Sequence, residues 1–359
     1  MAGRTLQEVV LELESQNRAK ADFIAPAKGM RLREDGSTFE INHLMTGEQQ
    51  AFNASTILHK QIGAALNIPA KYYNLMREEK PELLSHNINS WFADMNNSFM
   101  VRSFMYPEES IGRALLSTQY RRIDNLMIAE TVLSEFAGRS EYEVIETEVT
   151  ERKLYFKIVN HRMEANVNVG DAVQGGVIVS NSEVGLGAVS IQPFVYRLVC
   201  SNGMVATELS NRKTHVGKVQ NALENSFQIY SSDTEAAEDK ALSLKIRDTI
   251  QGTLSEEVFK MAVYKLKLAT EEFIDGDPAE VIRLAGKVYD FSNKEKTGIL
   301  RHLVDGGDLS KYGLSNAITS TCHEIKDFDR ATELQGIGWQ VATMKRDLWD
   351  QINGNAYML

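Results

Sequence analysis

The chain has 359 residues, of which 43% are hydrophobic and 25% are charged; these ordinary globular proportions argue against a largely disordered protein. The formal net charge of −10 argues against a protein that binds polyanions over its whole surface. The two cysteines, Cys200 and Cys322, lie far apart and lack the spacing of a zinc site or a disulfide framework. We therefore expect two free thiols in a reducing compartment.

The N-terminal segment is acidic and amphipathic, unlike the apolar core of a secretory signal. No apolar run is long enough to span a bilayer. These features predict a cytoplasmic protein without a membrane partner.

Residues 1–111 predict a mostly helical N-terminal region. Leu6, Val9 and Leu13 are spaced as on one face of an amphipathic helix within the first twenty residues. A capping sequence at 53–55 predicts a second helix, which the Ile68-Pro69 step should end. Further elements are expected as helices over 71–76 and 81–91 and a strand over 99–104.

Residues 112–215 predict an α+β core that contains an antiparallel sheet. Two alternating runs joined by a charged turn, 142–149 and 153–159, indicate a β-hairpin. Glycine pairs precede two more apolar runs, at 177–179 and 188–198. We therefore predict an antiparallel β-meander flanked by helices, with the sheet between about residues 99 and 205.

Residues 216–359 predict a helical C-terminal region. From about Val216 the apolar residues keep helical spacing almost to the end of the chain. Gly276-Asp277-Pro278 and Gly306-Gly307 mark breaks between helices.

Several short motifs follow one another along residues 50–325. They include Arg-Ala-Leu-Leu-Ser-Thr-Gln-Tyr-Arg-Arg-Ile-Asp-Asn at 113–125 and Ser-Asn-Ser-Glu-Val-Gly at 180–185. The others lie at 58–61, 66–72, 87–91, 197–204 and 312–319. In this order they resemble the phage/plasmid-like proteins that carry domain of unknown function 932. The resemblance implies a mobile-element gene and a product in the host cell cytoplasm, but no mechanism.

The motif at 120–125 lies in a stretch that we expect to separate two helices. It admits two interpretations. In the first, Arg121 and Arg122 contact phosphate while Tyr120 stacks on a base. In the second, an Arg–Asp pair that includes Asp124 is structural, and Tyr120 and Ile123 lie in the core. Residue types alone leave both open for the two arginines.

Asn181, Ser182 and Glu183 precede a Gly-x-Gly turn between two apolar strands. Small polar residues in this position usually cap a turn. A carboxylate at a strand end can also act as a general base or a metal ligand, which makes Glu183 a catalytic candidate. The Gly185-Leu186-Gly187 turn lacks the third glycine of a dinucleotide-binding loop, so we exclude that function.

Around residue 200 the residue types allow covalent chemistry. Cys200 could be a nucleophile with His215 as its base, but the apolar run 198–200 is more typical of a buried strand. We therefore predict that Cys200 is buried and faces away from Arg197. Asn202-Gly203 predicts a tight turn with positive φ.

A basic stretch follows at the entry to the next helix, with Arg212, Lys213, His215 and Lys218. Helix N–H groups and these cations together could hold a phosphate; a solvated charged loop is the alternative. Residues 112–229 hold twelve Lys and Arg against thirteen Asp and Glu, so they contribute only −1 to the net charge. Any nucleic-acid site is expected in this region.

Three functions follow from these patterns. The first is a homo-oligomeric protein that binds single-stranded DNA, with strand-annealing activity in recombination. Its predicted contacts are Tyr120, Arg121, Arg122, Arg197, Asn202, Arg212, Lys213 and Lys218. The second is an enzyme acting on a nucleotide or nucleic acid through Glu183, Arg197, Asn202 and His215. The third is a non-catalytic interaction or anti-defence protein. No histidine has a partner at metal-ligand spacing, so neither a metal nor a cofactor is predicted.

Overall fold

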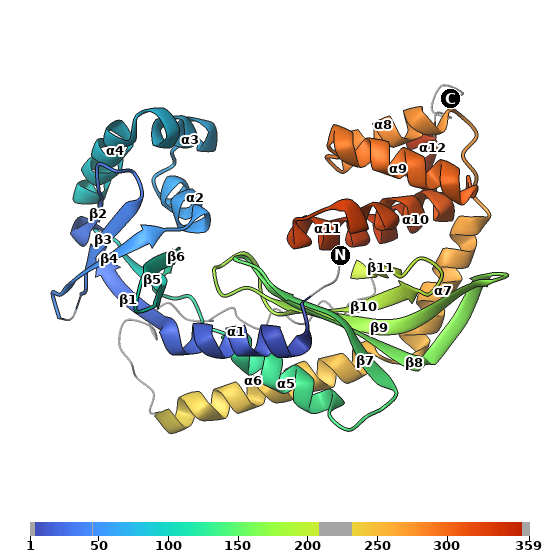
Figure 1. Ribbon diagram of the computed structural model, residues 1–359, viewed down its shortest axis with the longest axis horizontal. Coiled ribbons are helices and arrows are strands. Elements are labelled where there is room, and N and C mark those ends of the chain that lie inside the picture. Colours follow the sequence, from blue (N-terminus) through green and yellow to red (C-terminus); the bar gives the residue numbers. More distant parts are fainter. Residues whose placement is uncertain (1–3, 45, 208–231, 354–359) are drawn as a thin grey trace.

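The computed structural model describes residues 4–44, 46–207 and 232–353. It contains two sheets and a C-terminal group of helices (Figure 1). The N-terminal sheet with its helices and the C-terminal helices rise from the same side of the central sheet, one at each end of the molecule (Figure 1). No helix in these described ranges is both long and apolar enough to cross a membrane.

The N-terminal sheet has six strands in the order β1-β5-β6-β4-β3-β2. The strands are β1 (Lys20–Pro26), β2 (Met30–Leu32), β3 (Thr38–Asn42), β4 (Gln49–Ala54), β5 (Ser98–Met105) and β6 (Ser110–Ser117). Neighbouring strands are antiparallel except for β4 and β6, which are parallel. Three helices, α2 (Thr56–Ala65), α3 (Ala70–Glu79) and α4 (Pro81–Asp94), bury Leu58, Tyr73 and Phe92 against this sheet.

The central sheet is an antiparallel meander in the order β11-β10-β9-β8-β7. Its strands are β7 (Tyr142–Val149), β8 (Leu154–Asn168), β9 (Asp171–Asn181), β10 (Ser190–Arg197) and β11 (Asn202–Val205). Leu154, Phe156 and Ile158 alternate along β8 and face a core shared with α1 (Leu6–Ala19), α5 (Asn125–Phe136) and α6 (Ser232–Thr253). These three helices cover one face of the sheet, as Figure 1 shows.

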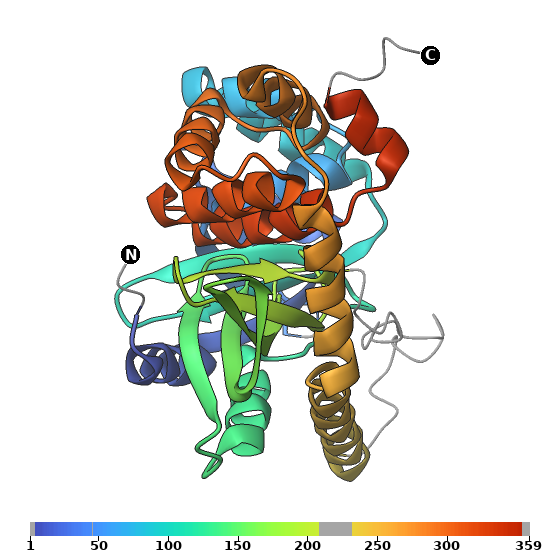
Figure 2. The same ribbon diagram turned by 90° about the vertical axis from the view of Figure 1, so that its right-hand side faces the viewer.

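The C-terminal helices are α7 (Glu256–Thr270), α8 (Pro278–Val288), α9 (Asn293–Gly306), α10 (Lys311–Thr321), α11 (Phe328–Ala342) and α12 (Arg346–Ile352). Of these, α7, α10 and α11 cover the other face of the central sheet, whereas α8, α9 and α12 share a separate core with α10 and α11. Trp339 of α11 and Tyr312 of α10 are buried against Val173 and Val195 of the sheet. Figure 2 shows α6 and α7 following one another along the side of the molecule.

The predicted fold class is confirmed: the chain is α+β, the meander is antiparallel and the described part of the last third is helical. The predicted first four helices are also confirmed, and Ser55 caps α2 as its sequence indicates. The strands β1 to β4 were not predicted. β2 and β3 alternate but have only three and five residues, and β1 and β4 mix polar with apolar residues on at least one face. The residue boundaries of the three predicted regions stay predictions.

The prediction for residues 198–203 is wrong. Cys200 is exposed, and so are Leu198 and Val199, because β10 ends at Arg197 and a turn follows. Within that turn the Arg197 Nη1 donates to the Cys200 Sγ at 3.1 Å, so the two side chains meet instead of facing apart. The positive φ belongs to Ser201, at 51°, while Asn202 and Gly203 lie in β11.

The two cysteines are predicted to differ sharply in reactivity. Both are free thiols; Cys200 is exposed, whereas Cys322 is buried and burial raises the pKa of its thiol to about 12. The thiolate is the reactive form of cysteine. An alkylating reagent at pH 8 should therefore modify Cys200 quickly and Cys322 only after unfolding. Peptide mass mapping of a time course checks this, with Cys200→Ser as the control. Early labelling of Cys322 would contradict the described burial.

His59 is predicted to make the protein acid-sensitive. Its imidazole is buried beside the Tyr73 hydroxyl, with 2.8 Å between Nδ1 and Oη, and burial, with a smaller effect of Arg77, lowers its pKa to about 4. The folded pKa lies below the unfolded one, so the stabilisation is complete above pH 6.5 and is lost as the pH falls towards 4. We expect about 2 kcal/mol less unfolding free energy from this group at pH 5 than at pH 7.5.

Urea unfolding of the wild type and of His59→Gln at both pH values measures this difference. The variant should lose the His59 contribution to the pH dependence but keep that of the carboxylates. Equal pH dependence in the two proteins would show that His59 is not held neutral.

Candidate functional site

Two of the sequence motifs meet where the two sheets adjoin. Residues 118–124 connect β6 to α5, not two helices as predicted, and residues 182–185 follow β9. The Tyr120 hydroxyl donates to the Ser182 carbonyl oxygen at 2.9 Å. The Asn181 Nδ2 donates to the Ile123 carbonyl oxygen at 3.0 Å and to the Asn125 Oδ1 at 2.8 Å. We call residues 117–125 and 180–185, with their ion-pair partners, the motif junction.

Glu183 is the central carboxylate of the motif junction and is buried. Its Oε2 accepts from the Arg113 Nη1 at 2.7 Å, and its Oε1 accepts from the backbone N–H of Asn125 at 2.7 Å. Asn125 is the first residue of α5, and a negative charge is favourable at a helix N-terminus. The Arg113 guanidinium also lies 3.9 Å above the Phe104 ring. Glu183 therefore anchors β6, α5 and the end of β9 to one another.

Arg102 of β5 forms the second anchor and is fully buried. Its Nε donates to the Asp22 Oδ1 and its Nη2 to the Asp124 Oδ1, both at 2.9 Å. Its Nη1 reaches the Glu183 carbonyl oxygen at 3.1 Å. Burial alone would raise the pKa of Asp124, but hydrogen bonds from Lys20 and Arg102 outweigh burial and hold that pKa below its ordinary value. Asp124 thus stays ionised at neutral pH.

The motif junction carries a surplus of positive charge. Its ion pairs join five cationic side chains, Lys20, Arg102, Arg113, Arg121 and Arg122, to the carboxylates of Asp22, Asp124, Glu183 and Glu238. The Arg122 side chain is 58% exposed, and its guanidinium lies 3.8 Å from the already engaged Asp22 carboxylate. Arg121 is similarly 3.8 Å from Glu238, which is itself exposed. These two arginines are held loosely at the surface.

Tyr120 and Ile123 belong to the interior of this region. Ile123 is buried in the central core, and Tyr120 is half-buried against a small cluster that includes Leu116 and Val184. Burial raises the pKa of the Tyr120 hydroxyl, which is already a hydrogen-bond donor. The geometry therefore supports the structural interpretation for Tyr120, Ile123 and Asp124, and leaves only the two arginines available to a ligand.

Arg197 and Asn202 lie at the other end of the central sheet. The Arg197 Nε donates to the Asp171 Oδ1 at 2.6 Å, and Asp171 also accepts from the Tyr312 hydroxyl at 2.9 Å. Asn202 is buried and donates to the Thr319 Oγ1 at 2.7 Å. Asp171 and Asn181 are the two ends of β9. The contacts of Arg197 and Asn202 are therefore separated from the motif junction by roughly 30 Å.

The structure thus brings together some predicted site residues and separates others. Tyr120, Arg121, Arg122 and Glu183 share the motif junction, whereas Arg197 and Asn202 join the C-terminal helices to the sheet. Arg212, Lys213, His215 and Lys218 lie outside the described residues. Within the described ranges, no three His, Cys, Asp or Glu side chains are grouped so that they could hold a metal ion.

Lys20, Asp22 and Arg102 were not predicted as residues of the site. The signal for Arg102 was present: it is the one charge in the apolar run from Phe99 to Phe104. A charge in a core strand requires buried partners. The identity of those partners, Asp22 from β1 and Asp124 from a distant loop, depends on strand order and could not be read from spacing.

Residues 114–279 match the family model described as Domain of unknown function (DUF932). No curated protein matches the chain, and no solved structure does.

Proposed function

Because this chain belongs to the domain of unknown function 932 family over residues 114–279, and its motifs resemble phage and plasmid-like proteins, we propose that it is a mobile-element protein that binds single-stranded DNA. Strand annealing during recombination, by a homo-oligomer of this chain, is the activity that we assign to it. The proposed contact surface is the exposed side of the motif junction, together with the basic stretch that contains Arg212, Lys213 and Lys218.

The observation that carries the proposal is the positive surplus at the motif junction of a chain whose net charge is −10. Arg102 and Arg113 already form ion pairs with the buried carboxylates of Asp22 and Glu183. They therefore hold the surface in place but do not contact the ligand. Arg121 and Arg122 have only distant, partly exposed or shared carboxylate partners. A guanidinium in that state can exchange its partner for a phosphate with little loss of stability.

Catalysis is less well supported by the same geometry. Both carboxylate oxygens of Glu183 already accept hydrogen bonds, from Arg113 and from the N-terminus of α5. A general base needs a free oxygen within reach of a substrate proton. Glu183 is therefore better suited to holding the binding surface in shape than to reacting.

The double substitution Arg121→Ala/Arg122→Ala tests the proposal. We expect it to weaken binding of a fluorescent oligodeoxythymidine about tenfold at low salt, because roughly two phosphate contacts are lost. Stability should change by less than about 1 kcal/mol, since each arginine lies 3.8 Å from its carboxylate partner and each pair has one exposed member. Fluorescence anisotropy and urea unfolding measure the two quantities.

The charge-matched control is Lys345→Ala/Arg346→Ala, which removes two exposed cations from the start of α12. It should leave the affinity unchanged. If both double variants weaken binding equally, the effect is one of net charge, and the motif junction is not the contact surface.

A further inference from the structure

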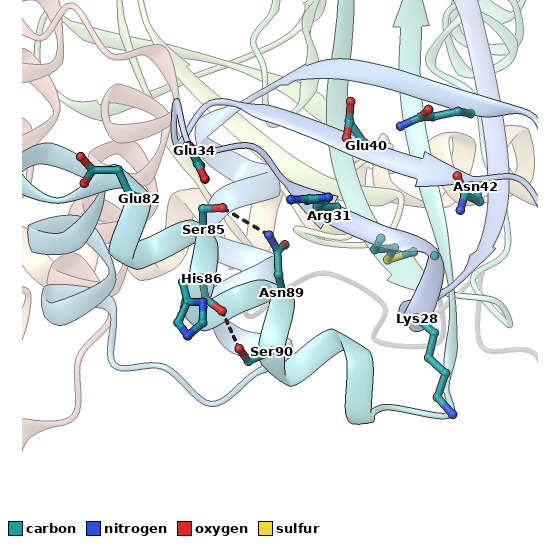
Figure 3. Close-up of a pocket in the computed structure, with 13 residues that line it drawn as sticks. Lys28, Arg31, Glu34, Glu40, Asn42, Glu82, Ser85, His86, Asn89 and Ser90 are labelled. Carbon is teal, nitrogen blue, oxygen red and sulfur yellow. Dashed lines mark hydrogen bonds between the residues drawn. The ribbon is translucent and has the colours of Figure 1, made fainter.

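A polar groove of about 640 Å³ lies between α4 and the β2–β3 edge of the N-terminal sheet (Figure 3). It shares no lining residue with the motif junction. Its volume falls within the range of roughly 300–1,000 Å³ that is typical of ligand sites.

The walls of the groove are fixed by an unusual edge contact. β2 pairs with β3 on one side only, so its other edge would be open. There the Asn89 side chain accepts from the Leu32 N–H at 2.8 Å and donates to the Leu32 carbonyl oxygen at 2.9 Å. The Ser85 hydroxyl donates to the same oxygen at 2.8 Å. Helix α4 thus occupies the place of a neighbouring strand, which closes the edge and holds the two walls at a set spacing.

Charged side chains are ordered by sign along the groove. Figure 3 shows Glu34 and Glu82 towards one end, Lys28 towards the other, and Arg31 between them. In the part of the chain that the structure describes, none of these four side chains has a hydrogen bond or ion pair. Glu40 differs, because its carboxylate is bonded to the Arg33 Nε at 2.7 Å. The groove therefore presents unpaired charges of both signs on a rigid frame.

We propose that this groove binds a short hydrophilic peptide segment that carries both a carboxylate and a cationic group. The planar guanidinium of Arg31 suits a carboxylate, with Lys28 adding charge, while Glu34 and Glu82 suit an ammonium or a guanidinium. No Phe, Tyr or Trp side chain lines the groove, so it offers no ring of that kind on which a nucleobase could stack. The unpaired carboxylates of Glu34 and Glu82 balance the charges of Lys28 and Arg31, so the groove has no positive surplus that would favour a polyanion. The site is thus distinct from the proposed DNA surface.

Blocked tetrapeptides provide the probe, with lysine at one end, glutamate at the other and two serines between, in both orders. Isothermal titration calorimetry with the full chain should show binding of one order, and at least tenfold weaker binding when either charged residue is replaced by glutamine. Arg31→Gln and Glu82→Gln should each weaken the binding at least tenfold. Arg346→Gln, which is exposed on α12, should not change it.

Absence of binding by both orders, or equal binding of the singly charged peptides, would overturn the proposal. Equally tight binding of free arginine or glutamate would overturn the peptide assignment in favour of a small zwitterion. Saturating oligodeoxythymidine should not displace the peptide, so a failure of this proposal can be told apart from a failure of DNA binding.

Discussion

Replacing Arg102 by methionine will lower the free energy of unfolding by about 3–5 kcal/mol. The guanidinium is fully buried and pairs with both Asp22 and Asp124, and the Asp22 side chain is only 7% exposed. Methionine fills a similar volume but leaves the Asp22 carboxylate with only the distant Arg122 as a partner. Removing one member of a buried ion pair costs more stability than replacing both members by apolar residues, because the remaining charge stays buried without a partner.

Urea unfolding followed by circular dichroism measures this loss. The matched control is Arg18→Met on α1, where the arginine is 72% exposed and its ion pair with Glu14 measures 4.0 Å. That substitution should change stability by less than about 0.5 kcal/mol. A similarly small change for Arg102→Met would mean that the buried cluster does not join the two sheets.

The second large effect is predicted for the pair formed by Glu183 and Arg113. Each single substitution to alanine should cost about 3–5 kcal/mol, because it leaves the other charge buried and unpaired. The double variant should lose clearly less than the sum of the two, with a coupling above 1 kcal/mol. We expect this coupling because the ion pair measures 2.7 Å and both side chains are buried, with Glu183 7% and Arg113 10% exposed.

The exposed ion pair of Glu280 and Arg283 on α8 provides the control, and the same double-mutant cycle is measured on it. Its coupling should stay within about 0.5 kcal/mol. If Glu183 acted as a free general base instead of an anchor, Glu183→Ala would leave stability nearly unchanged while it abolished an activity. That pattern would restore the enzyme hypothesis.

Long periodic segments made the fold class predictable from sequence. The helical spacing of α1 and the alternation along β7 and β8 each extend over several residues, so local physics and the tertiary fold agree. β2 has only three residues and β3 only five, so their alternation is too short to stand out, and β4 has polar residues on both faces. Those strands exist because α2, α3 and α4 cover them, which is a tertiary effect.

The site was predictable only in part, for a related reason. The motifs at 117–125 and 180–185 marked the residues that meet, and Glu183 was among them. Sequence could not show that Arg197 lies far from Arg121. Their separation is set by the length of β9, because Arg197 bonds to Asp171 at one end of that strand and Asn181 at the other end bonds to Ile123. It also could not show that the apolar run at 198–200 is an exposed turn, since burial there depends on where β10 stops.

A salt titration of single-stranded DNA binding tests the proposed function most directly. The affinity for oligodeoxythymidine should fall linearly on a log–log plot against salt, by roughly 0.7 units for each phosphate neutralised, and should exceed the affinity for a duplex of equal length. Arg212→Ala/Lys213→Ala, and separately Arg121→Ala/Arg122→Ala, should each flatten the slope by about one to two units. The proposal is contradicted if no binding occurs at low salt, or if neither double substitution changes the slope.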